Sequence, residues 1–163
     1  MKKIYLLLFL ITTVTAFSQD NKDSNFWDNV RFGGGFGLDF GNNNTTVSIS
    51  PSAIYNFNKS FSLGLGVGYL YNKRADFKSN VFSSSIISLY NPLKEIQISA
   101  EYEHLFVNRS SNTINNTYNY PALYLGAAYR SGNFSLGIRY DVLYNKDKSI
   151  YTSPISPIVR IYF

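Results

Sequence analysis

The chain of 163 residues contains no cysteine and only one histidine, and these shortages exclude several kinds of site. Without cysteine there is no disulfide, no thiolate metal site, no cysteine nucleophile and no lipid-anchored N-terminal cysteine. Any histidine-dependent chemistry must use His104, and one histidine is poor evidence for a metal site. We therefore expect no catalytic residue, no bound metal and no cofactor, and we interpret His104 as an interface residue.

Long apolar runs and concentrated charge are also missing from most of the chain. After Val14 no apolar run approaches the roughly 18 residues that a membrane helix needs. The formal net charge is +5, without the dense basic stripe that nucleic-acid binding requires, so we expect no nucleic-acid partner. If such a chain enters a membrane it must do so as a closed β-barrel, because its backbone hydrogen bonds must be satisfied internally.

The first 18 residues have the features of a secretory signal peptide. Lys2 and Lys3 precede the apolar run 4–14, and Ala16-Phe17-Ser18 supplies small residues at the −3 and −1 positions of a cleavage site. Cleavage removes two lysines and no acidic residue, which lowers the net charge from +5 to +3. We expect residues 19–29 to form a periplasmic leader and residues 30–163 to form one β-barrel domain.

An alternation with a period of two runs through this domain, which is rich in aromatic residues (14 Tyr and 13 Phe in the chain). On a barrel in lipid the apolar face of each strand points outward. The pattern predicts an all-β fold, an eight-stranded antiparallel up-and-down transmembrane β-barrel. The expected strands are 30–40, 47–57, 61–69, 83–90, 96–103, 121–129, 134–142 and 150–163. The parity of 83–90 and 121–129 stays open, as does the accommodation of the prolines within strands.

The connections between these segments predict the orientation. Three are short and are expected on the periplasmic side, at 58–60, 91–95 and 130–133. Four polar outer loops are expected at 41–46, 72–82, 108–120 and 145–149, and two of these are long. Short inner turns with longer outer loops are typical of transmembrane barrels. Aromatic girdles are expected at the inner rim (Phe57, Phe61, Tyr129, Phe134, Phe163) and at the outer rim (Phe40, Tyr69, Phe106, Tyr144).

Charged residues of both signs share the inward parity. They are Arg31, Asp39, Glu101, Glu103, Arg139, Asp141 and Arg160. Buried charges need partners, because an unpaired one costs several kcal/mol, so these residues are interior ion-pair candidates. We expect Glu101 to pair with Arg139, and Arg31 to lie near Arg160 where the first and last strands close. A barrel of this size has room for little besides its own side chains, which favours a packed polar plug over catalysis or proton conduction.

Several segments resemble a group of short exported barrel proteins of Gram-negative bacteria. They are 29–35, 51–55, 85–92, 120–123, 137–144 and 146–151. The architecture is similar to the OmpA/OmpX-type barrels, a porin-like family. This resemblance implies outer-membrane lipid around the barrel, the outer-membrane barrel assembly machinery as a partner, and terminal Phe163 as the assembly signal. Some relatives carry the name alpha-ketoglutarate decarboxylase, but the Gly-Asp-Gly motif that holds thiamine diphosphate in such enzymes is absent here.

Three functional hypotheses follow. The first is a non-enzymatic outer-membrane barrel of the cell envelope, with a structural or surface-interaction role through its outer loops. The second is a soluble secreted barrel that turns its Phe/Tyr/Leu face inward around a small apolar ligand. The third is a lipid-modifying barrel enzyme, which rests on His104 and the loops; Phe106 stands where the lipid A deacylases have a catalytic serine. No feature of the sequence names an oligomeric state.

Overall fold

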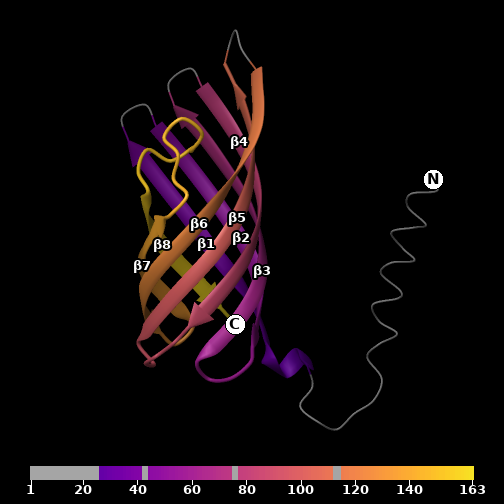
Figure 1. The fold of residues 1–163 in the computed structure, drawn as a ribbon, viewed down its shortest axis with the longest axis vertical. Coiled ribbons are helices and arrows are strands. Elements are labelled where there is room, and N and C mark those ends of the chain that lie inside the picture. Colours follow the sequence, from indigo (N-terminus) through magenta and orange to yellow (C-terminus); the bar gives the residue numbers. More distant parts are fainter. Residues whose placement is uncertain (1–25, 42–43, 75–76, 112–114) are drawn as a thin grey trace, which may run out of the picture.

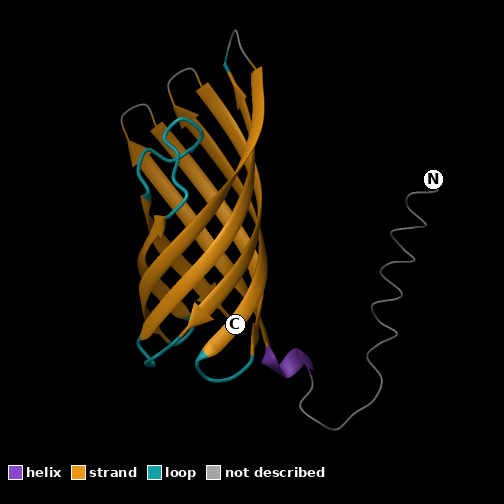
Figure 2. Cartoon of the chain, in the orientation of Figure 1, coloured by secondary structure: helices purple, strands orange, loops and turns teal. Residues whose placement is uncertain are grey.

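The computed structural model describes residues 26–41, 44–74, 77–111 and 115–163. Eight antiparallel strands form a closed barrel in which neighbours in sequence pair and β8 returns to β1 (Figures 1 and 2). The expected all-β, eight-stranded up-and-down barrel is thus confirmed. The strands are β1 (Val30–Gly41), β2 (Asn44–Asn56), β3 (Phe61–Arg74), β4 (Phe77–Tyr90), β5 (Ile96–Ser110), β6 (Asn115–Ser131), β7 (Phe134–Asp141) and β8 (Ile155–Tyr162). The expected signal peptide and the leader up to residue 25 lie outside the described residues.

The start of β1 and the end of β8 lie at the same end of the barrel, here called the proximal end (Figure 1). Just before β1, Phe26–Asn29 form one 3₁₀ turn, and the Phe26 ring stacks on Tyr55 with 4.9 Å between centroids. Trp27 is exposed beside it. Within the described residues no helix is long and apolar enough to cross a membrane. The opposite, distal end carries the β1–β2, β3–β4 and β5–β6 hairpins and the connection from β7 to β8.

The apolar residues of the strands lie on the outside of the barrel. Leu38, Leu65 and Ile138, all expected to face outward, are more than 60 % exposed, and Phe32 and Ile98 are also exposed. The sixth expected residue, Ile161, is half-buried beside Gly34, its register partner in β1. These exposed side chains lie on the opposite face from the one that a soluble barrel with an inward Phe/Tyr/Leu face would need.

The two strands of open parity are now assigned. In β4 the side chains of Ile87 and Leu89 are buried inside the barrel, whereas Phe82 and Ile86 are exposed. In β6 Tyr124 is buried, and the alternate residues Leu125 and Tyr129 are exposed. Both strands are apolar on both faces because their inner faces take part in apolar clusters within the barrel.

Three of the expected outer loops, 41–46, 72–82 and 108–120, are wrong, because most of their residues belong to strands. The β3–β4 ladder continues to Arg74 and Phe77, and the β5–β6 ladder continues to Ser110 and Asn115. Both segments are rich in polar residues, which predicts loops, but their inward residues Val81, Tyr118 and Tyr120 belong to or pack on an apolar cluster inside the barrel. The buried residues Leu70, Val81, Leu105, Val107 and Tyr120 form the distal apolar cluster, which stabilises the extended strands.

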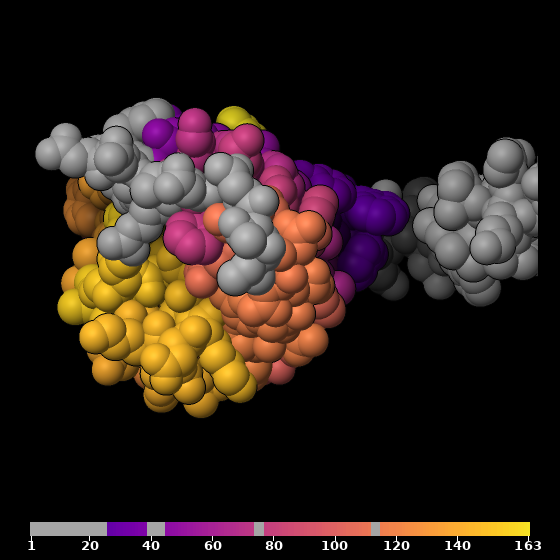
Figure 3. All heavy atoms as spheres, turned by 90° about the horizontal axis from the view of Figure 1, so that it is seen from above, coloured from indigo at the N-terminus to yellow at the C-terminus, as the bar shows by residue number. Residues whose placement is uncertain are grey.

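The last connection is longer than expected. It spans residues 142–154 rather than 145–149, because β7 ends at Asp141 and β8 begins only at Ile155. The expected strand 150–163 is therefore wrong over its first five residues. From the distal end, this connection is seen folded over part of the barrel opening (Figure 3, orange to yellow). The three proximal turns are short, as expected; the second spans residues 91–95 as expected, whereas the first spans 57–60 instead of 58–60 and the third 132–133 instead of 130–133.

The three prolines within strands occupy positions where a neighbouring ladder is interrupted. The β2–β3 register skips Pro51, and Pro121 lies beyond the end of the β6–β7 register, which begins at Tyr124. Pro157 lies beyond the β1–β8 register. A proline lacks the backbone N–H that a ladder needs, so each one is tolerated where a ladder bond is missing.

Candidate functional site: the charged interior and the barrel ends

Three charged side chains from different strands meet inside the barrel. The carboxylate of Glu101 in β5 accepts hydrogen bonds through Oε2 from Arg139 Nη1 in β7 at 3.1 Å and from Arg160 Nη2 in β8 at 2.8 Å. The side chains are only 7–17 % exposed. The structure thus brings together the expected pair of Glu101 and Arg139 and adds Arg160 to it. One carboxylate bridges two guanidinium groups.

Arg139 is held from several sides. Its Nε donates to Ser156 Oγ at 3.1 Å, and its guanidinium carbon lies 3.9 Å from the centroid of the Tyr124 ring. The carboxylate of Glu103 is 4.0 Å from Nη1 of the same guanidinium. A planar cation fixed by two carboxylates, a hydroxyl and an aromatic face has little freedom to move. This arrangement suits a rigid polar plug.

The other candidate residues have different roles. Asp141 pairs with no arginine among the described residues; its Oδ1 accepts backbone N–H bonds from Leu123 at 3.2 Å and Leu143 at 3.0 Å. Arg31 donates to the side-chain oxygen of Asn133 and to the carbonyl of Tyr162. Arg31 and Arg160 therefore use separate partners instead of sharing one. The side chain of Asp39 lies outside the described residues.

The connection 142–154, here called the distal segment, is attached to the barrel wall. The backbone N–H of Val142 donates to the carbonyl of Leu123 at 2.7 Å, and that of Ile150 donates to the Tyr120 hydroxyl at 3.1 Å. Ile150 and Tyr151 pack on the distal apolar cluster. Burial raises the pKa of the Tyr151 hydroxyl above its ordinary value. The distal segment thus closes part of the barrel from above.

A cavity of about 730 Å³, here called the interior cavity, lies beside the three charged residues. Besides Glu101, Arg139 and Arg160, hydroxyl side chains line it. The residues of β2 that line it are Thr46, Ser48, Ser50 and Ser52. The alternate serines of β2 were visible in the sequence as an inward polar face, but nothing there indicated an unfilled space. The volume of the cavity depends on the distances between the opposite walls of the barrel and the distal segment, which the sequence does not give.

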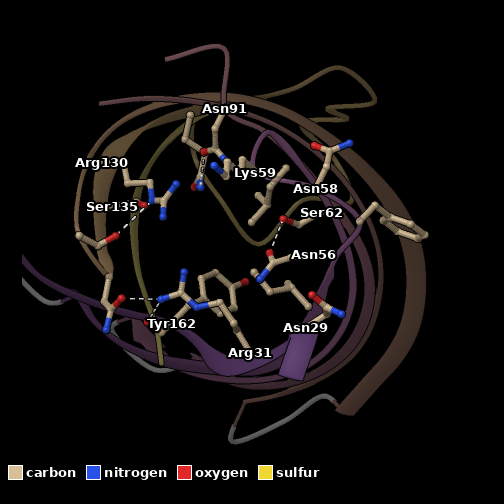
Figure 4. Close-up of a pocket in the computed structure, with 16 residues that line it drawn as sticks. Asn29, Arg31, Asn56, Asn58, Lys59, Ser62, Asn91, Arg130, Ser135 and Tyr162 are labelled. Atoms are coloured by element: carbon tan, nitrogen blue, oxygen red, sulfur yellow. Dashed lines mark hydrogen bonds between the residues drawn. The ribbon is translucent and has the colours of Figure 1, made fainter. Parts of the chain in front are cut away.

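A second cavity of about 460 Å³ lies at the proximal end (Figure 4). Three cations, Arg31, Lys59 and Arg130, line it, and no carboxylate of the described residues does so. Most other lining groups are amides and hydroxyls, among them Asn56, which accepts a hydrogen bond of 2.6 Å from Ser62. Sequence reasoning placed Lys59 and Arg130 in separate turns and missed that the barrel brings these turns together. The cavity presents positive charge at the proximal end.

His104 lies on the outer wall and is half-buried. Its ring contacts Phe106 edge-on at 4.9 Å between centroids, and its register partners are Ser84 and Pro121. In the part of the chain that the structure describes, no three His, Cys, Asp or Glu residues are grouped so that they could hold a metal ion. The surroundings of His104 are those of an aromatic surface.

Aromatic residues gather near both ends of the outer wall. Near the proximal end Phe57, Phe61, Tyr129, Phe134 and Phe163 are all exposed, as expected for the inner rim. Toward the distal end, Tyr69, Phe82 and Phe106 are consecutive register partners on β3, β4 and β5. Tyr144, expected at the outer rim, instead donates from its hydroxyl to the carbonyl of Tyr151 within the distal segment. The side chain of Phe40 is outside the described residues.

The chain matches no protein-family model, no curated protein and no solved structure. The resemblance to OmpA/OmpX-type barrels therefore stays a prediction, and the function must be argued from the geometry.

Proposed function

We propose that this protein is a small non-enzymatic outer-membrane β-barrel without a through-channel, which acts in the cell envelope through its two ends. The observation that carries the proposal is an apolar belt around the middle of the barrel. It is formed by exposed side chains that include Phe32, Phe36, Leu38, Val47, Ile49, Leu63, Leu65, Val67, Ile86, Ile98, Tyr102, Leu125, Leu136 and Ile138. A continuous apolar surface of this kind is rare on soluble monomers and is the surface that lipid covers.

The length of the belt fits a bilayer. Its outward apolar residues run from Phe61 to Tyr69 on β3 and from Ile96 to Phe106 on β5. A tilted strand crosses the hydrocarbon core with about 9–11 residues, and both runs fall in that range.

The outer wall becomes polar beyond the row of Tyr69, Phe82 and Phe106. The outward residues distal to this row are Tyr71, Lys73, Lys78, Asn80, Asn108, Ser110, Thr117 and Asn119. At the same level the interior holds the distal apolar cluster. The outward residues are thus apolar in the middle part of the barrel and polar in the distal part. This change fits lipid around the middle part and water around the distal part. It marks the distal boundary of the proposed membrane span.

The side chains in the interior argue against a channel through the barrel. Glu101 joins β5 to β7 and β8 across the lumen, and the distal segment packs on the distal apolar cluster. Eight strands leave an interior just wide enough for side chains. Interaction through the exposed ends is the role that these features favour.

Expression of the full chain in a Gram-negative host tests the proposal. We expect the protein in the outer-membrane fraction, with faster gel migration before boiling than after it, because a closed barrel stays compact in detergent. Protease added to intact cells should cut the distal segment and leave the proximal turns uncut. Recovery of the folded protein in the soluble periplasmic fraction would overturn the proposal.

A further inference from the structure

The wall of the barrel is incomplete at the closure between β1 and β8. β1 pairs with β2 from Val30 to Gly41, but its register with β8 covers only Gly33 to Gly35. On the other side of β8, the register with β7 reaches Ile155. Among the described residues, the stretches 36–41 of β1 and 155–159 of β8 therefore run without mutual pairing. We call these two stretches the seam.

The sequence of β8 accounts for the seam. The N–H of Phe163 donates to the carbonyl of Phe32 in β1, whereas the N–H of Tyr162 donates away from β1, to Asn133. Backbone groups alternate in direction along a strand, so the odd-numbered residues of β8 point toward β1. Beyond Val159 these are Pro157, which has no N–H, and Ile155, whose N–H donates to Ser153 Oγ at 3.1 Å. Neither residue can therefore donate a backbone hydrogen bond to β1.

The interior cavity reaches the outer wall at the seam. On β2 it is lined only by alternate, inward-facing residues from Thr46 to Ser52. On β1 and β8, by contrast, it is lined by the continuous stretches 35–38 and 155–160. These stretches include Phe36, Leu38 and Pro157, which are exposed on the outer wall. Residues of both faces can line one cavity only where the wall between them is open.

We propose that the seam is a lateral binding site for a single-chain lipid with an uncharged, hydroxylated head group, such as a monoacylglycerol. The acyl chain lies along Leu38, Ile155 and Pro157, and the head group enters between the hydroxyls of Ser48 and Ser50. An uncharged head group fits because the two carboxylates of Glu101 and Glu103 balance the two arginines beside the cavity. The site rests on the proposed function in one respect, namely that lipid surrounds the apolar belt.

The absence of native cysteine allows a direct test. Extending the β1–β8 register places Leu38 opposite Pro157, so a disulfide in L38C/P157C would close the seam. The matched control L65C/I86C joins two outward residues that are already register partners in β3 and β4. Both variants are folded into phosphatidylcholine vesicles that contain a trace of monolauroylglycerol with a diazirine in its chain. After illumination, the labelled peptides are identified by mass spectrometry.

We expect labelling of residues 36–41 and 155–159 to exceed labelling of the rest of the belt severalfold in the wild type. Oxidised L38C/P157C should lose this excess, its reduced form should match Pro157→Val because both have an N–H at position 157, and the control should keep the excess in both states. Pro157→Val, which restores an N–H toward β1, should lower the excess without a cross-link. The same probe chain on a carboxylate or phosphocholine head group should give a smaller excess.

Two results would overturn the site. One is uniform labelling around the belt, and the other is an excess at the seam that the closed disulfide leaves unchanged. Failure of the proposed function has a different signature, since a protein outside the bilayer would leave the whole belt unlabelled. Gel migration before and after boiling verifies that each variant is folded.

Discussion

Glu101 is the residue on which the interior network depends, because one of its oxygens accepts from both Arg139 and Arg160. Arg139 has Glu103 as a second acid at 4.0 Å, whereas the ion pairs of the described residues give Arg160 no acid other than Glu101. The Nη1 atom of Arg160 is buried without a hydrogen-bond partner in the described structure. Loss of the Glu101 charge therefore affects Arg160 most.

We predict that Glu101→Gln lowers the free energy of unfolding by about 3–5 kcal/mol, the usual cost of breaking a buried ion pair. Urea titration of the protein folded in lipid vesicles measures this. Glu95→Gln, in an exposed proximal turn, is the matched control and should change stability little. Equal effects of the two substitutions would contradict a structural role for the network.

Because Glu101 bridges two arginines, a combined substitution that removes Glu101 must remove both Arg139 and Arg160. Apolar replacement of Glu101 and Arg139 together removes one ion pair completely. The structure shows that this double variant still leaves Arg160 buried without an acid. We predict that only the triple variant Glu101→Leu, Arg139→Met, Arg160→Met recovers stability relative to Glu101→Gln, measured by the same titration. A double variant as stable as the triple one would show that Arg160 does not need Glu101.

Gly137 in β7 illustrates how closely the strands approach. A Cβ at this position would lie 2.1 Å from the carbonyl oxygen of Ala127 and 2.4 Å from the Cα of Ala128, both backbone atoms of β6. We predict that Gly137→Ala destabilises the barrel by about 1–3 kcal/mol or more, because the backbone must move. Gly37→Ala should cost less, since its Cβ meets only the rotatable Ser48 hydroxyl. The gel-shift unfolding temperatures of the two variants should therefore differ.

At the scale of elements, Asp141 joins the start of the distal segment to the wall, because it accepts backbone N–H bonds from Leu143 in the segment and from Leu123 in β6. We predict that Asp141→Ala releases the segment while the barrel stays folded, because the β-ladders are formed by other residues. Limited proteolysis should then cut within 142–154 faster than in the wild type. Asp147→Ala, at an exposed position of the same segment, should leave the cleavage rate unchanged. Unfolding of the whole barrel in Asp141→Ala would contradict this division.

For the whole molecule, the change in polarity of the outer wall sets the proposed membrane boundary at the row of Tyr69, Phe82 and Phe106. We predict that Leu65→Lys, within the apolar belt, costs about 2–4 kcal/mol of folding free energy in vesicles. Thr117→Lys, on the outer wall beyond the boundary, should cost little, because its position faces water. Folding titrations in vesicles compare the two. A similar cost for both would place the boundary elsewhere.

The sequence determined the strands of the apolar belt. The alternation in β1, β3, β5 and β7 assigned inward and outward faces correctly, because side chains on a strand alternate with a period of two. The same period placed Glu101 and Arg139 on the inner face, and the structure places them 3.1 Å apart. The polar residues of 72–82 and 108–120 predicted loops, whereas the strands continue through most of both segments because the outer wall is polar there.

Only the tertiary structure decided which inward residues meet and where the wall stays open. The meeting of Arg160 with Glu101 depends on the register of strands far apart in the chain, which no local pattern encodes. The distal segment folds inward because its residues Ile150 and Tyr151 pack against the distal apolar cluster. This cluster exists only in the closed barrel. The seam also depends on the tertiary structure. Pro157 is visible in the sequence, but its missing N–H leaves strands unpaired only because β1 is the neighbouring strand on that side.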